Sequence, residues 1–275
     1  MEGYGEAYSA ITVLNAFATG IGSAIGIDLK VRVRVKRSDE YRLRVMYMGR
    51  EIPVDSRLVD TIVDYFRSRF HLEDELDIFI DTDIPPKVGL KSSSAVSNAL
   101  ITAMIDYLGI EMEEYEILSL NSTLSLKAGV SVTGALDDAA ASLKGGLVVT
   151  NNLRREILYR EEIGRKEVLI VFLKGERETG RYRGIDFSPI RDAVEFAGEM
   201  LLRGLWREVA VLNGLIYSGY LGLNPKPIFK ALEMGAETAG LSGKGPAYYM
   251  IGGDMERYAS EMEAIGYRTI WTWTR

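Results

Sequence analysis

The sequence predicts an α+β protein of two domains. Segments with strand-like alternation and segments with helical spacing follow one another along the whole chain of 275 residues, and in the second half strands enclose helices. That length suits one or two domains. The polar and charged stretch around residues 151–155 separates two groups of elements. We therefore place an N-terminal α/β domain at 1–152 and a C-terminal domain of the ferredoxin-like, split βαβ type at 153–275.

The N-terminal half contains an amphipathic strand. Residues 27–36 alternate apolar and charged side chains, which predicts a strand with one buried and one wet face. Residues 41–48 continue the alternation, and Ser38-Asp39-Glu40 between them predicts a hairpin turn. We also expect a helix at 58–70 capped by Asp55-Ser56, a strand at 76–80, helices at 96–108 and 113–127, and a strand at 147–149.

The C-terminal half follows a charged segment and mixes strands with helices. The predicted strands lie at 168–173, 247–251 and 267–273, and the predicted helices at 189–202, 206–220, 225–234 and 255–265. No repeat or low-complexity tract interrupts this series.

Composition excludes most catalytic chemistry. The chain has no cysteine, so it offers no disulfide, thiol nucleophile, iron–sulfur cluster or cysteine-ligated zinc. Its single histidine, His71, lies in a charged run typical of a solvated helix end, and sites with several histidines are excluded. The net charge of −6 argues against nucleic acid as a partner. Carboxylates, Lys, Arg, hydroxyls, backbone amides and a hard cation remain, and these are the groups of phosphoryl transfer.

An uncharged stretch, residues 7–27, raises the question of a membrane segment. Most of its residues are small, polar or Tyr, which fits a glycine-rich loop between buried strands better than a membrane span. Gly22 and Gly26 form a G-x-x-x-G pair and leave a membrane helix as the alternative. The first residues carry no basic segment of the kind that begins a secretory signal. We expect a cytoplasmic protein that does not bind membranes.

The strongest local motif is Gly89 to Ala95, directly before a predicted helix. Glycine lets the backbone approach a ligand, the three serines offer helix caps, and free N–H groups with the helix dipole favour an anion. Lys91 adds positive charge. The alternative is a serine-capped helix without a ligand.

Two further segments carry candidate chemistry. Asp137 and Asp138 are adjacent carboxylates in a small, apolar stretch, where burial is costly unless they are hydrogen-bonded or functional. One could orient a hydroxyl and one could help to hold Mg²⁺, or one could cap a helix. The glycine-rich run 240–246 could pack against a nucleotide or form a plain turn.

A local excess of basic residues lies within 174–191, in an otherwise acidic chain. Arginines there, Arg181 and Arg183 among them, could grip a carboxylate or a phosphate. A solvated loop with ion pairs is the alternative.

Together these segments resemble the GHMP superfamily of small-molecule kinases. Pro86-x-x-Gly89-Leu90-x-Ser92-Ser93-x-Ala95 resembles its phosphate-binding motif, Leu136-Asp137-Asp138 with Gly145-Gly146 its aspartate segment, and Leu241-Ser242-Gly243-x-Gly245-Pro246 its C-terminal glycine motif. Within the superfamily the chain is most similar to the archaeal shikimate kinases, through Tyr8 to Ile11, Asn15 to Gly20, Gly26 to Asp28 and Val132 to Ala140.

The resemblance covers essentially the whole chain and implies the two-domain GHMP kinase fold, ATP and Mg²⁺ as cofactors, and phosphorylation of the 3-hydroxyl of shikimate. By match to the motifs it implies Asp137 as the catalytic residue and Ser93 as a Mg²⁺ ligand. Asp138, the carboxylate beside Asp137, is the second candidate ligand of Mg²⁺. The implied ATP-binding residues are Pro86, Lys87, Val88, Gly89, Leu90, Lys91, Ser92, Ser93, Ser94, Ala95, Gly243 and Gly245. The candidate shikimate-binding residues are Asn15, Thr19, Thr133, Arg181 and Arg183.

The chain departs from the family pattern at two positions. Many relatives carry a lysine in the N-terminal motif, where this chain has Ala10, and mevalonate kinases carry a Mg²⁺-binding glutamate where this chain has Leu126. These departures leave the full ligand set of Mg²⁺ open. Another GHMP kinase, acting on homoserine or mevalonate, is the alternative function, and a non-catalytic binding protein on a related fold is a further one.

Overall fold

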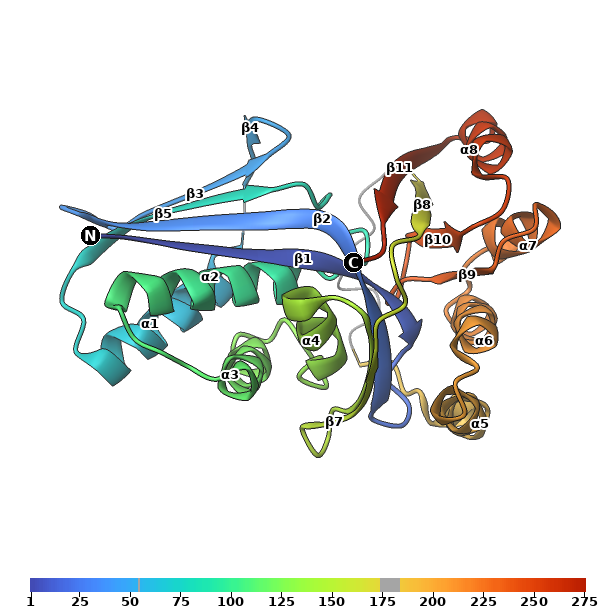
Figure 1. Ribbon diagram of the computed structural model, residues 1–275, viewed down its shortest axis with the longest axis horizontal. Coiled ribbons are helices and arrows are strands. Elements are labelled where there is room, and N and C mark those ends of the chain that lie inside the picture. The colour runs from blue at the N-terminus through green and yellow to red at the C-terminus, as the bar shows by residue number, and fades with distance from the viewer. Residues whose placement is uncertain (54, 174–183) are drawn as a thin grey trace.

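The computed structural model describes residues 1–53, 55–173 and 184–275, and the strands of these residues form two sheets (Figure 1). The first sheet has the order β4-β3-β5-β2-β6-β7, with β1 paired to β2 outside this path, and the second has the order β11-β8-β10-β9. The first sheet comprises β1 (Glu2–Leu14), β2 (Ile21–Ser38), β3 (Arg42–Tyr47), β4 (Arg50–Glu51), β5 (Glu75–Thr82), β6 (Leu147–Asn151) and β7 (Glu156–Glu161). The second comprises β8 (Glu167–Leu173), β9 (Thr238–Leu241), β10 (Tyr248–Ile251) and β11 (Tyr267–Trp273).

The long strand β2 pairs with three other strands of the first sheet. It pairs antiparallel with β1 along nearly its whole length, with β5 through residues 31–38 and with β6 through residues 21–25. Its alternating pattern buries Val31, Val33 and Val35 and leaves the charged residues between them more accessible. The predicted strand at 27–36 is therefore confirmed, and it begins earlier than predicted.

Helices cover one face of the first sheet, as Figure 1 shows. They are α1 (Arg57–Phe70), α2 (Ser92–Leu108), α3 (Glu114–Lys127) and α4 (Leu136–Lys144). The short helix α4 packs through alanines against Ala10 of β1, Ala24 of β2 and Leu118 of α3. Small side chains at this contact let the helix that carries Asp137 and Asp138 lie close to the sheet.

The remaining helices lie beside the second sheet, on the right of Figure 1. They are the 3₁₀ helix η2 (Ser188–Ile190), α5 (Arg191–Leu202), α6 (Trp206–Tyr220), α7 (Lys226–Glu233) and α8 (Met255–Ala264). The mixed α+β class and all the elements predicted in this half are confirmed, and β9 and η2 are additional to them. The division of the chain after residue 152 stays a prediction; β7, which follows that residue, pairs with β6 of the first sheet.

The predicted hairpin at Ser38-Asp39-Glu40 is wrong. β3 pairs in parallel with β5, which lies between β3 and β2. Local alternation identifies a strand but not its neighbour, and here a later segment of the chain occupies the place of the expected partner.

The glycine-rich stretch 7–27 is largely strand rather than loop. β1 and β2 fill most of it, and a short turn joins them. No helix of the described residues is long and apolar enough to cross a membrane.

Candidate active site

The segment between β5 and α2 directs the N-terminus of a helix toward a cavity. α2 begins at Ser92, and Lys91 occupies the cap position with a left-handed φ of 57°. No side chain of the described residues caps the helix, so the predicted serine caps are wrong: the serines lie inside the first turn, where Ser93 and Ser94 line the cavity. Uncapped N–H groups and the helix dipole together favour an anion here.

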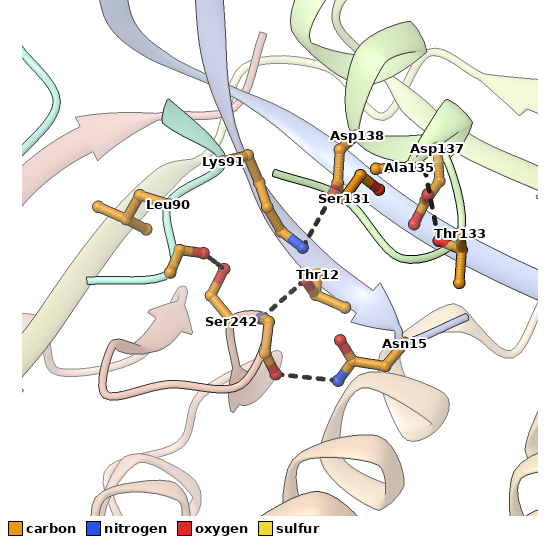
Figure 2. Close-up of polar contacts among 12 residues, drawn as sticks. Thr12, Asn15, Leu90, Lys91, Ser131, Thr133, Ala135, Asp137, Asp138 and Ser242 are labelled. Carbon is orange, nitrogen blue, oxygen red and sulfur yellow. Dashed lines mark hydrogen bonds and ion pairs between the residues drawn. The ribbon is translucent and has the colours of Figure 1, made fainter. Parts of the chain in front are cut away.

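The loop between β9 and β10 packs directly on this segment. Ser242 Oγ donates a hydrogen bond to the Gly89 carbonyl at 2.8 Å, as Figure 2 shows. A Cβ at Gly89, whose φ is +90°, would lie 2.6 Å from the carbonyl oxygen of Ser242. Gly243 donates its N–H to Thr12 Oγ1 at 2.9 Å. Both glycine-containing motifs are thus held together at the end of β1.

Asp137 lies in the first turn of α4 and is almost completely buried. Asn152 Nδ2 donates a hydrogen bond to Asp137 Oδ1 at 2.9 Å and another to Thr133 Oγ1 at 3.2 Å. Gly22 leaves room for the carboxylate, because a Cβ at Gly22 would lie 2.5 Å from Asp137 Oδ2. These contacts fix Asp137 at the cavity wall.

Asp138 forms a buried ion pair with Lys91. Lys91 Nζ lies 3.0 Å from Asp138 Oδ2, and each side chain is 11% exposed. Figure 2 shows the ammonium approaching the carboxylate from the start of α2. The second carboxylate oxygen, Oδ1, is buried and accepts no hydrogen bond from the described residues. Asp137 and Asp138 are both in the first turn of α4, after Ala135 at the cap position, so neither is an N-cap.

Burial, followed by the charge of Asp137, raises the pKa of Asp138 above its ordinary 3.8, and Lys91 partly offsets this shift. A carboxyl whose pKa is raised by folding adds stability at low pH, and that stability is lost as the pH rises through the folded value. Removal of Lys91 would raise the pKa of Asp138 further, so the loss of stability would be greater at high pH.

We therefore expect Lys91→Met to lower the free energy of unfolding by about 3–5 kcal/mol at high pH, the usual cost of breaking a buried pair. At pH values low enough to protonate Asp138 the loss should be smaller. Thermal unfolding of the protein without nucleotide or magnesium, measured across this range, checks the difference. Adding Asp138→Asn to the same chain should abolish the pH dependence; equal losses at all pH values in Lys91→Met would contradict the assigned pair.

The cavity between these elements has a volume of about 140 Å³. Five segments meet there: the turn after β1 with Asn15 and Phe17, the start of α2, α3 through Ser125, residues 130–138 and Lys244 from the β9–β10 loop. Two ammonium groups, two carboxylates and several hydroxyls thus surround one small space beside a helix N-terminus.

Some of the predicted site residues line the cavity and others do not. Its lining includes Asn15, Lys91, Ser93, Ser94, Thr133, Asp137 and Asp138. The other described candidates, Thr19, Pro86, Lys87, Val88, Gly89, Leu90, Ser92, Ala95, Gly243 and Gly245, are not among the lining residues. Val88, Leu90 and Ala95 are buried, which anchors residues 86–95, the candidate phosphate loop. Arg181 and Arg183 lie outside the described residues.

The structure adds residues that the sequence reasoning did not select. Lys244 and Ser131 line the cavity, and Asn152 holds Asp137. The signal for Lys244 was present, because a lone charge stands between Gly243 and Gly245 in a quoted motif. No local signal marked Asn152, whose role depends on a contact 15 residues away in the chain.

The two departures from the family pattern are visible in the structure. Ala10 is fully buried in the packing between β1 and α4. Leu126 is 39% exposed, and among the described residues no group of three or more His, Cys, Asp or Glu side chains gathers into a metal site. The basic side chains that line the cavity are Lys91 and Lys244.

Comparisons with known proteins identify the family and the fold. The family model described as the GHMP kinases N-terminal domain matches residues 57–146. Mevalonate kinase of Methanococcus jannaschii superposes with a TM-score of 0.74 at 14% identity, covering 100% of this chain and 99% of that one. Homoserine kinase of Cytophaga hutchinsonii superposes with a TM-score of 0.72 at 20% identity, covering 100% and 95%. The matched family model and the fold define a GHMP kinase, an ATP-dependent phosphotransferase.

Relatives in sequence show which family of GHMP kinases the chain belongs to. Shikimate kinase of Thermococcus kodakarensis is 44% identical over 262 residues, which is 95% of this chain and 96% of that protein. Shikimate kinase of Pyrococcus furiosus is 44% identical over 267 residues, or 97% of each chain. The chain belongs to the archaeal shikimate kinase family, and the resemblance seen in its motifs is confirmed.

Proposed function

We propose that this protein transfers the γ-phosphoryl group of ATP to the 3-hydroxyl of shikimate. The observation that carries the choice of acceptor is the 44% identity to shikimate kinases over nearly the full chain. The two structural neighbours are a mevalonate kinase and a homoserine kinase, but at 14% and 20% identity they support the fold alone. Because ATP is the donor, the proposal places the enzyme in the cytoplasm.

The cavity suits a small polar acceptor. Its volume is about 140 Å³, and hydroxyl, carboxylate, amide and ammonium groups line it. Thr133 and Asn15 line it and are proposed to hydrogen-bond the acceptor. The Nδ2 of Asn15 is already used, donating to Gly243 and Asn213, so its Oδ1 is the atom left for an acceptor hydroxyl.

In the proposed reaction Asp137 acts on the acceptor hydroxyl. The hydroxyl oxygen forms a bond to the γ-phosphorus while the bond from that phosphorus to the β,γ-bridging oxygen breaks, and the hydroxyl proton passes to the Asp137 carboxylate. Asn152 keeps Oδ1 of Asp137 in place, so Oδ2 is the proposed base. The N–H groups of α2 and Lys91 stabilise the phosphate charge.

Magnesium fits the residues present. Mg²⁺ is usually held by one or two carboxylates together with substrate phosphates, and Asp138 offers a buried oxygen that accepts no hydrogen bond from the described residues. Asp138 and Ser93 would hold the ion beside the phosphates, where it neutralises their charge. Thr19, Arg181 and Arg183 remain proposed ligands of the acceptor; a carboxylate suits the fork of an arginine.

The proposal is tested by coupled ADP release with shikimate, homoserine and mevalonate side by side. We expect turnover with shikimate and none with the other two acceptors. Turnover with mevalonate and none with shikimate would overturn the proposal. A protein that MgATP stabilises against heat, but that consumes ATP with none of the three, would instead support the non-catalytic alternative.

A further inference from the structure

Lys244 enters the cavity from the second half of the chain. It lies in the loop between β9 and β10 and lines the same space as Lys91, Asp137 and Asp138. The residue before it is held in place. Gly243 donates its N–H to Thr12 Oγ1, and its carbonyl accepts a hydrogen bond from Asn15 Nδ2. The backbone that carries Lys244 is therefore held against the end of β1.

The ammonium of Lys244 has no counter-charge among the residues that the structure describes. No described residue forms an ion pair with it, whereas Lys91 is paired with Asp138. Its Nζ lies 4.7 Å from the centroid of the Phe17 ring, and Phe17 stacks on Phe187 at 5.3 Å. A cation–π contact orients an ammonium without neutralising it, so the side chain is placed and its charge is available.

The surroundings of Lys244 disfavour an unpaired cation. Burial, and then the charge of Lys91, lower the pKa of Lys244. A bound anion between the two lysines would relieve both effects. Lys91 lies at the start of α2 and contacts Asp138, so an anion that meets both lysines lies at the reacting end of the cavity, where the phosphates would bind.

We propose that Lys244 binds the phosphoryl group during its transfer and is a further catalytic residue of this enzyme. This rests on the proposed kinase function. The division of work follows from the contacts: Lys91 shares its charge with Asp138, whereas Lys244 has no carboxylate partner among the described residues and its full charge can meet the charge that develops on the transferring group. A role at the acceptor carboxylate is less favoured, because that group must point away from the reacting hydroxyl.

The test compares Lys244→Met and Lys244→Arg with Lys226→Met, which removes the same charge from an exposed position on α7. Loss of one stabilising contact to a transition state lowers kcat by about 10²–10³-fold, and we expect this for Lys244→Met with little change in the KM for shikimate. Lys244→Arg should recover part of the lost kcat, and Lys226→Met should behave as wild type. An unchanged kcat, or a raised KM for shikimate alone, would overturn the assignment.

A binding measurement separates this inference from the proposed function. ADP with aluminium fluoride mimics the transferring phosphoryl group, so wild type should bind it more tightly than ADP alone by calorimetry. Lys244→Met should lose that gain while binding ADP normally and unfolding at an unchanged temperature. If wild type fails to phosphorylate shikimate, the proposed acceptor is wrong, and this experiment still decides the role of Lys244: a retained gain in Lys244→Met would contradict it.

Discussion

Replacement of Asp137 by asparagine is expected to lower kcat by about 10²–10⁴-fold, the range for a positioned acid–base group. The substitution keeps the shape of the side chain and removes the charge that accepts the hydroxyl proton. Asn152 can still donate to the amide oxygen in place of Asp137 Oδ1. Steady-state kinetics with shikimate and ATP measure the loss. ATP binding and melting temperature should change little, because the start of α2 is a separate element.

A second variant, at Gly22, tests whether the position of the Asp137 carboxylate matters separately from its charge. Gly22→Ala would place a methyl group 2.5 Å from Asp137 Oδ2, so it should displace the carboxylate and lower kcat while the charge remains. A folded Asp137→Asn variant that keeps wild-type kcat would reject the catalytic role. A variant that merely unfolds would instead indicate a structural role for Asp137.

Gly89→Ala is expected to weaken ATP binding strongly. Its left-handed φ of +90° alone costs a residue with a Cβ about 1–2 kcal/mol. The added Cβ would also lie 2.6 Å from the carbonyl oxygen of Ser242 and 3.1 Å from that of Gly245. Backbone atoms cannot yield as a side chain can, so the β9–β10 loop and the phosphate loop must separate. We expect the KM for ATP to rise by about tenfold or more.

The matched control for Gly89→Ala is Gly109→Ala. Gly89 lies shortly before α2 and Gly109 directly after it. Gly109 follows α2 with a φ of +62°, and a Cβ there would meet no atom within 4 Å. Gly109→Ala should therefore lower stability by the backbone strain alone and leave the KM for ATP unchanged. Equal effects of the two substitutions on the KM for ATP would show that the contact between the loops does not matter.

Sequence reasoning selected residues that line one cavity, but it did not predict which elements lie next to one another. Asp137, Asp138 and the start of α2 could be selected because each lies in a short motif whose residues are consecutive, and all three line the cavity; their chemical roles stay predictions. The hairpin after β2 was wrong because β5 displaces β3 from β2, and nothing within residues 27–48 encodes that insertion. The serine caps failed because Lys91 takes the cap position.

Contacts over long distances in the chain account for what the motifs did not reveal. The Lys91–Asp138 pair and the Gly89–Ser242 hydrogen bond join residues far apart in sequence. Lys244 becomes part of the site only because the β9–β10 loop folds onto the end of β1. A single sequence gives the local element that carries such a residue, but not the partner that it meets.

Identification of the product tests the central claim most directly. Purified enzyme, ATP, Mg²⁺ and shikimate should yield one phosphorylated product, and phosphorus–proton correlation by NMR should connect its phosphorus to the proton on carbon 3 of the ring. Asp137→Asn should form the same product far more slowly. Phosphate on another hydroxyl, or release of ADP without any phosphorylated shikimate, would contradict the assignment of this protein as a kinase of the shikimate 3-hydroxyl.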